Sequence, residues 1–162
     1  MHVEDEIVTK KMRGVVTVEV IRDGRHGPEV ISREVTHNLI VNTGKKQTWR
    51  QAAGLSANAW DQFRIGTSGV APVSSDLNVK SPVTGTLKTA DSLTLLAGQR
   101  TFQAVISYPS GAGSKSAAGI SEVVLLNQHT SPGGSAFMRA IFTPQNKTEN
   151  DKLRITYQVR FG

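Results

Sequence analysis

Hydrophobic residues recur at every second position along much of this chain, which is the period of a β-strand with one buried face. The last segment is the clearest, because Leu153, Ile155, Tyr157, Val159 and Phe161 alternate with polar residues. Further segments have a similar alternating or β-branched character. They are residues 15–21, 30–41, 63–66, 101–108, 121–127 and 136–143. The pattern therefore predicts a protein built mainly from strands.

Two of these segments carry additional information. The run Val15–Ile21 is β-branched almost throughout and leads into the turn dipeptide Asp23-Gly24. We therefore expect a hairpin with residues 30–41, across a turn at 22–28. Residues 121–127 contain four consecutive apolar positions. Such a run is typical of a strand that is covered on both faces.

One helix is predicted between Thr43, which is placed to cap its start, and Gly54, which stands where a left-handed terminator belongs. Trp49, Ala52 and Ala53 would face inward between these ends. Long loops rich in Gly, Ser, Pro and Asn separate the strands, and we expect them to reach toward neighbouring molecules. They are residues 67–80, 110–119, 128–135 and 144–152.

Many short strands joined by turn-rich loops predict an all-β fold, an antiparallel β-sandwich, jelly-roll-like, with one short helix and long loops. The 162 residues fit a single domain. We expect residues 14–162 to form this β-sandwich domain, and the polar, charged residues 1–13 to form a flexible N-terminal arm. The start of the arm has three acidic residues and no apolar core, so a signal peptide is not expected.

The charge balance is basic, with 19 Lys and Arg against 13 Asp and Glu and a formal net charge of +6. The cations are scattered singly or in pairs such as Lys45-Lys46, and only 6% of residues are aromatic, which is few for base stacking. We therefore expect an acidic protein surface as the partner, with no specific nucleic acid. No apolar run approaches the roughly 18 residues that span a bilayer, so no membrane association is predicted.

No residue pattern indicates a catalytic, cofactor or metal site. The chain has no cysteine, which excludes disulfides and thiolate chemistry. The segment 111–116 lacks the adjacent Gly-Lys of a phosphate-binding loop. The four histidines have no metal-ligand spacing, and a hydrogen-bonded structural role is expected for the one near a strand end, His37. The others are His2, His26 and His129.

Glu122 is the most unusual carboxylate, because it lies among the apolar residues of its strand. A glycosidase would need a second carboxylate within about 5–9.5 Å, and the sequence names no candidate. We therefore expect buried pairing of Glu122 with Arg139 on a neighbouring strand. We therefore expect that the protein is not an enzyme and has no cofactor.

Three local patterns resemble those of a widespread kind of tailed-bacteriophage virion protein. The first is IGTSGVAP at 65–72 with Ser75-Asp76-Leu77, similar to a strand followed by GTG-x-x-x-P and D-x-x-L. The second is ISEVVLLN at 120–127, similar to I-x-E-x-G-L-F-N, with Val124 where glycine is usual. The third is the hairpin that starts with FMRAIF at 137–142 and continues through Lys147-Thr148 to LRITY at 153–157. Together the patterns cover about residues 38–162.

The resemblance implies a β-sandwich in the outer shell or tail of a virion that acts through contacts. We expect a capsid decoration (cement) protein that bridges and stabilises major capsid subunits, as a homo-oligomer with a trimer favoured, assembled in the host cytoplasm. A tail, head-fibre or baseplate subunit of the virion is the alternative within this class. A carbohydrate-binding module is the alternative outside it, but Trp49 and Trp60, in or near the helix, are expected to fill the core.

Overall fold

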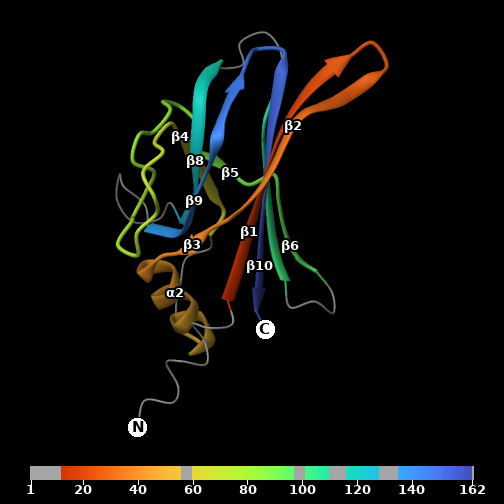
Figure 1. The fold of residues 1–162 in the computed structure, drawn as a ribbon. Helices are drawn as coiled ribbons and strands as arrows, with labels where there is room; N and C mark the ends of the chain where they lie inside the picture. The colour runs from red at the N-terminus through yellow and green to blue at the C-terminus, as the bar shows by residue number, and fades with distance from the viewer. Residues whose placement is uncertain (1–11, 56–59, 97–100, 110–115, 128–134, 162) are drawn as a thin grey trace.

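Two antiparallel sheets of five strands each pack face to face in the computed structural model, which describes residues 12–55, 60–96, 101–109, 116–127 and 135–161 (Figure 1). The predicted all-β antiparallel sandwich with one short helix is confirmed. The elements are β1 (Met12–Gly24), β2 (Gly27–His37), β3 (Leu39–Ile40), α2 (Asn42–Ala52), β4 (Gln62–Gly66), β5 (Lys88–Thr89), β6 (Ser92–Leu96), β7 (Thr101–Tyr108), β8 (Ala117–Asn127), β9 (Ser135–Lys147) and β10 (Asp151–Phe161).

The first sheet, sheet A, has the order β2-β1-β10-β7-β6. β1 and β10 lie in its interior and pair along the whole length of β10, from Met12 opposite Phe161 to Arg22 opposite Asp151. Because side chains alternate between the faces of a strand, the buried residues Leu153, Ile155, Tyr157 and Val159 of β10 face the same side as Val16 and Val18 of β1. That side is the core.

The second sheet, sheet B, has the order β3-β9-β8-β4-β5. Its long central strand β8 is buried at every position from Ser121 to Asn127. The prediction of a strand covered on both faces is therefore confirmed.

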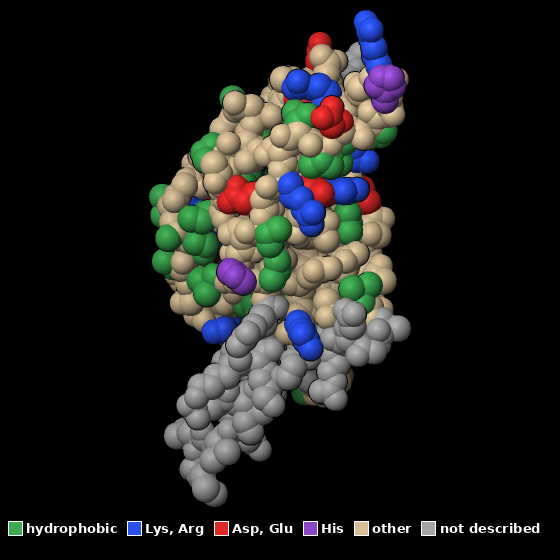
Figure 2. Space-filling model, turned by 45° about the vertical axis from the view of Figure 1, so that its right-hand side comes forward, with side chains coloured by type: hydrophobic (Ala, Val, Ile, Leu, Met, Phe, Trp, Pro, Cys, Tyr) green, Lys and Arg blue, Asp and Glu red, His purple; other side chains and the backbone are tan. Residues whose placement is uncertain are grey.

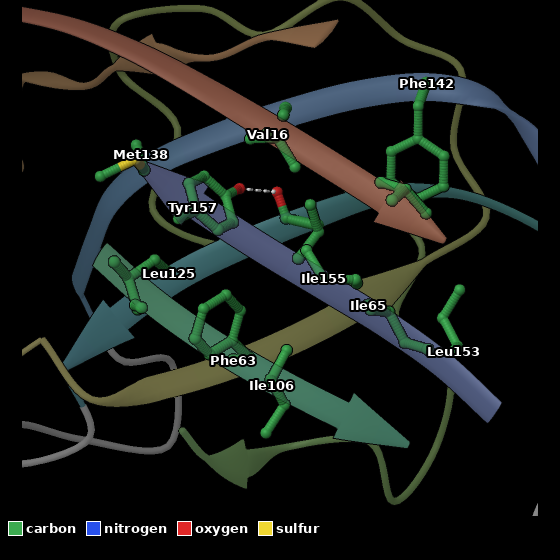
Figure 3. Packing of buried hydrophobic residues seen from close by; sticks show 14 of the residues in the cluster. Val16, Phe63, Ile65, Ile106, Leu125, Met138, Phe142, Leu153, Ile155 and Tyr157 are labelled. Carbon is green, nitrogen blue, oxygen red and sulfur yellow. Dashed lines mark hydrogen bonds between the residues drawn. The ribbon is translucent and has the colours of Figure 1, made fainter. Parts of the chain in front are cut away.

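The core lies between the sheets and contains apolar side chains from both (Figure 3). Phe63 of β4 and Tyr157 of β10 meet across it, with ring centroids 5.4 Å apart. Tyr157 is fully buried, and its hydroxyl donates a hydrogen bond of 3.0 Å to the backbone carbonyl of Val123 in the opposite sheet (Figure 3). A buried hydroxyl needs such a partner, because leaving it unpaired costs about 1–3 kcal/mol.

The chain crosses between the sheets at Asn38. Its backbone N–H donates to the carbonyl of Gly14 in sheet A, and its side-chain amide donates to the sulfur of Met138 in sheet B. β3 then pairs with β9. The prediction of one continuous strand over 30–41 is therefore wrong. Residues 36–38 are Thr, His and Asn, and residues 39–41 are Leu, Ile and Val, so the hydrophobic alternation stops at the crossing.

The first hairpin is tighter than predicted, because β1 and β2 pair up to Gly24 opposite Gly27. Its tip extends beyond the sandwich at the end opposite helix α2 (Figure 1). The predicted loop over 144–152 is wrong, since β9 continues to Lys147 and β10 begins at Asp151. Residues 144–147 are polar or proline and gave no hydrophobic signal. The short strands β5 and β6 were not predicted.

Helix α2 occurs where it was expected and ends as expected. Gly54 has a φ of 68°, and the N–H of Leu55 donates to the carbonyl of Arg50, which is the pattern of a glycine-terminated helix. Thr43 does not cap the start, because its hydroxyl donates to the carbonyl of Ala136 and so attaches the helix to β9. Ala53 is exposed, contrary to the prediction, while the side chains of Trp49 and Ala52 lie outside the described residues.

The described residues contain no helix that is long and apolar enough to cross a bilayer. Residues 1–11 of the predicted arm lie outside the described residues, and β1 already begins at Met12.

Candidate functional site

The outer face of sheet B is covered. Val124 and Leu126 of β8 point away from the main core and form a second apolar cluster with Val41, Val79 and Ala136. The covering segment is the β4–β5 loop, residues 67–87, which lies outside sheet B (Figure 1). A loop this long has few backbone partners of its own, so other groups must hold it in place.

A buried ionic cluster under this loop supplies those partners. Arg139 of β9 is fully buried, and its guanidinium binds the Glu122 carboxylate through Nε at 2.9 Å and Nη2 at 2.6 Å. Its Nη1 donates to Asp76 Oδ2 at 3.0 Å, and Nη2 also donates to the carbonyl of Val70 at 2.9 Å. The predicted burial of Glu122 against Arg139 is confirmed, and Asp76 is a third member that the sequence reasoning did not connect to it.

Glu122 also binds the backbone of the loop. Its carboxylate accepts hydrogen bonds from the N–H groups of Ser68 at 3.2 Å, Lys80 at 3.0 Å and Ser81 at 2.8 Å. Gly66 allows this approach, because a Cβ there would lie 2.3 Å from Glu122 Oε1. One carboxylate thus joins the start of the loop, at Ser68, to Lys80 and Ser81 in its second half.

Asp76 holds the middle of the loop. It accepts from the backbone N–H of Val73 at 2.9 Å and forms an ion pair of 2.6 Å with Lys80 Nζ. Burial by itself raises the pKa of Asp76, but the hydrogen bonds from Lys80, Val73 and Arg139 outweigh it and hold the pKa below its usual value. A carboxylate with these fixed donors and 3% exposure is an acceptor that organises the chain, not a general acid or base for a substrate.

Residues from the three sequence patterns described above meet in this cluster. Gly66 and Asp76 come from the first pattern, Glu122 from the second and Arg139 from the third. Their physical task is to keep a long loop in one conformation. The β4–β5 loop exposes Val70, Val73 and Leu77 to solvent, while the buried ionic cluster beneath it fixes its backbone.

The outer face of sheet A is open, in contrast to that of sheet B. The outward residues of β10 are at even positions, and they lie beside outward residues of β1 and β7 in continuous rows. In the row that contains Gln158, its side chain donates to Gln103 at 2.8 Å. Most of these side chains are half-buried or exposed, and none of the outward ones in the described rows is aromatic. The face is therefore broad and polar.

The charge on this face is mainly positive. Glu19 is its acidic residue in the rows crossed by β10, and it lies between Arg154, with Nη2 at 2.7 Å, and Arg33, with Nε at 3.8 Å. Lys152 and Arg160 add two further cations on the outward side of β10. Figure 2, turned toward the sheet A side, shows Lys, Arg and acidic side chains next to one another, with hydrophobic side chains scattered among them. This excess of positive charge suits an acidic partner.

In the part of the chain that the structure describes, the histidines do not come together in a site. His26, in the β1–β2 turn, and His37, at the end of β2, are exposed, so the expected structural role of His37 finds no support. His2, His129 and most of the segment 111–116 lie outside the described residues. Among the residues that the structure does describe, no group of three or more His, Asp or Glu side chains could hold a metal ion.

Described aromatic side chains do not form an exposed platform. Trp60 stacks on Phe137, with ring centroids 4.0 Å apart and planes at 18°, and Tyr108 and Tyr157 are buried. The expectation that Trp60 helps to fill the core is met, since it packs against the main cluster. Stacking on sugar rings requires exposed aromatic faces.

Comparison with known proteins gives no match, neither to a family model nor to a curated protein nor to a solved structure.

Proposed function

We propose that this protein is a structural subunit of a tailed-bacteriophage virion, and specifically a capsid decoration protein that bridges major capsid subunits. It has no catalytic role and acts only through contacts. The observation that carries the proposal is the open and basic outer face of sheet A, on a sandwich whose other outer face is covered by its own loop. The sequence patterns that resemble phage virion proteins supply the class.

The open face is suited to binding a shell. A decoration protein must contribute only a modest interface per copy, because many copies bound to one particle add their contributions by avidity. Four cations on this face outnumber its one carboxylate, Glu19; they are Arg33, Lys152, Arg154 and Arg160. The face therefore attracts an acidic surface, and the attraction orients the protein on that surface. A homo-oligomer, with a trimer favoured, would place several such faces on one joint between capsid subunits.

A tail, head-fibre or baseplate subunit is the second candidate, because the same sequence patterns and the same open face suit it. A carbohydrate-binding module is disfavoured by the packing of Trp60 against Phe137 and by the burial of the described tyrosines. The three candidates differ in the surface to which the protein binds, so a binding experiment distinguishes them.

The experiment is co-sedimentation of the purified protein with undecorated phage shells, with isolated tails and with the host's surface glycans. We expect saturable binding to shells at roughly physiological salt. Salt screens exposed ion pairs, but each of them contributes only about 0–1 kcal/mol, so the loss of affinity should be modest. Binding to tails alone would favour the second candidate, and binding to glycans alone would overturn the proposal.

Variants locate the contact. The double variant Lys152→Glu and Arg160→Glu reverses two cations on the outer face of sheet A, and we expect it to weaken shell binding by about tenfold or more, because like charges repel across an interface. Lys46→Glu makes the same kind of change at an exposed position of α2 and serves as the control. Equal weakening by both changes would show that only the net charge matters and would contradict the assigned face.

A further inference from the structure

A pocket of about 270 Å³ opens at the end of the sandwich where β7 ends and β8 begins. Its walls are largely apolar and come from both sheets and from the β4–β5 loop, with Ile65, Val83, Tyr108 and Ala117 among them. Two cationic side chains, Lys88 and Lys147, complete the lining. Pockets that bind small molecules have this composition, an apolar wall with a few placed polar groups.

The apolar wall is held in place by hydrogen bonds to the backbone. The Tyr108 hydroxyl donates to the carbonyl of Thr86 at 2.9 Å, and the Thr86 hydroxyl donates to the carbonyl of Val83 at 2.7 Å. Burial raises the pKa of Tyr108 far above its ordinary value, so the ring remains neutral. The loop segment on one side of the pocket is therefore fixed to the strand on the other, and the cavity is preformed.

Lys147 is the more informative of the two cations. It is only 4% exposed, and its ammonium donates to the carbonyl of Thr148 at 3.2 Å. Burial lowers the pKa of Lys147 against the opposing effect of the Asp151 charge. Its charge is thus partly deprived of water, and an anion in the pocket would stabilise it.

The charge of Asp151 acts on Lys147, but the Asp151 carboxylate is not reserved for it. Asp151 also accepts hydrogen bonds from Arg22 Nε at 2.8 Å and from the hydroxyl of Thr148 at 2.7 Å. Lys88 forms an ion pair with Asp91 at 2.8 Å and contributes little net charge.

We propose that this pocket binds a small apolar group that carries a carboxylate, with the carboxylate at Lys147 and the apolar part against Ile65, Val83 and Tyr108. The volume, just below the usual range for ligand sites, limits the occupant to one such group. A free medium-chain carboxylic acid and the carboxyl end of a peptide with a terminal apolar residue share this chemistry. The proposal does not depend on the function proposed above.

The first test is titration of the protein with octanoate and, separately, with the neutral 1-octanol, followed by calorimetry and by amide chemical shifts. We expect saturable binding of octanoate with shifts at the pocket residues, and binding of octanol weaker by about tenfold or more, because a hydrogen bond to a charged group is worth about 1.5–3 kcal/mol. Equal affinity for the two probes, or no saturable binding of octanoate, would overturn the proposal.

A second arm distinguishes the sources of the ligand. A short peptide that ends in leucine with a free carboxylate is compared with the same peptide amidated at its end. Tighter binding of the free form than of octanoate supports the site as a receptor for chain ends, and binding of octanoate alone supports a site for free acids.

Variants test the role of the lysines. Lys147→Met and Lys88→Met retain the apolar stem and remove the charge, and Lys46→Met on α2 is the matched control outside the pocket. We expect about a tenfold loss of octanoate affinity for Lys147→Met, a smaller loss for Lys88→Met and none for the control. If Lys147→Met does not fold, the loss of affinity in Lys88→Met relative to Lys46→Met decides the matter. Unchanged affinity in every folded pocket variant would contradict the proposed ligand.

Discussion

Replacing Arg139 with methionine should strongly destabilise the fold, although the change keeps the unbranched apolar stem of the side chain. Arg139 is fully buried and neutralises two carboxylates that are themselves buried, Glu122 at 0% and Asp76 at 3% exposure. Methionine would leave both carboxylates without the guanidinium. Removing one partner of a buried ion pair typically costs about 3–5 kcal/mol.

The size of this effect can be compared with the total. A domain of this kind is stable by about 5–15 kcal/mol, so Arg139→Met should remove a large part of the free energy of unfolding. The first assay is urea unfolding followed by circular dichroism. The second is hydrogen exchange of the backbone amides of Ser68, Lys80 and Ser81, which donate hydrogen bonds to Glu122. These amides should exchange much faster in the variant, because the loop is released.

A matched control is available on the other sheet. Arg154 also pairs with a glutamate, Glu19, but its side chain is 42% exposed. Arg154→Met should therefore cost only about 0–1 kcal/mol. If Arg139→Met costs no more than Arg154→Met, the buried cluster is not what holds the β4–β5 loop, and the reasoning fails.

Two further predictions follow from single contacts, and a third follows from the distribution of charge. Gly66→Ala should destabilise the fold by about 1–3 kcal/mol, because its Cβ would overlap Glu122, whereas Gly69→Ala, with open space around it, should change the unfolding midpoint little. The hydrogen bond from Arg22 lowers the pKa of Asp151, so its stabilisation is present at neutral pH and lost as the pH falls below about 4; the unfolding midpoint of Asp151→Asn should depend less on pH there, and an unchanged profile would refute the coupling. Retention of the protein on DNA should be negligible at roughly physiological salt, and tight retention abolished by neutralising the cations of α2 would overturn the protein-surface reading.

The strands that the sequence predicted best are those buried on one or both faces. β8 and β10 were found because burial imposes a hydrophobic pattern on them, and burial is what the pattern reports. The end of β9 was missed because residues 144–147 extend beyond the core and need no apolar side chains. The change of sheet at Asn38 was missed, although the polar residues 36–38 interrupt the alternation, because an interrupted pattern does not identify the new partner strand.

The buried ionic cluster and the pocket were only partly predictable from the sequence. The pairing of Glu122 with Arg139 was anticipated, because an acid in an apolar strand needs a cation nearby. The membership of Asp76 depends on how a long loop folds back, 63 residues away from Arg139 in sequence, and no local signal encodes it. The pocket beside Lys147 was missed for the same reason, since its walls come from five separate segments.

The most direct test of the proposed function is an electron-microscopy map of a phage particle that carries this protein. We expect density for the sandwich on the outside of the head, over joints between major capsid subunits, with the outer face of sheet A against the shell and the β4–β5 loop away from it. Density on the tail alone, or a sandwich bound to the head with the outer face of sheet A turned to solvent, would contradict the proposal.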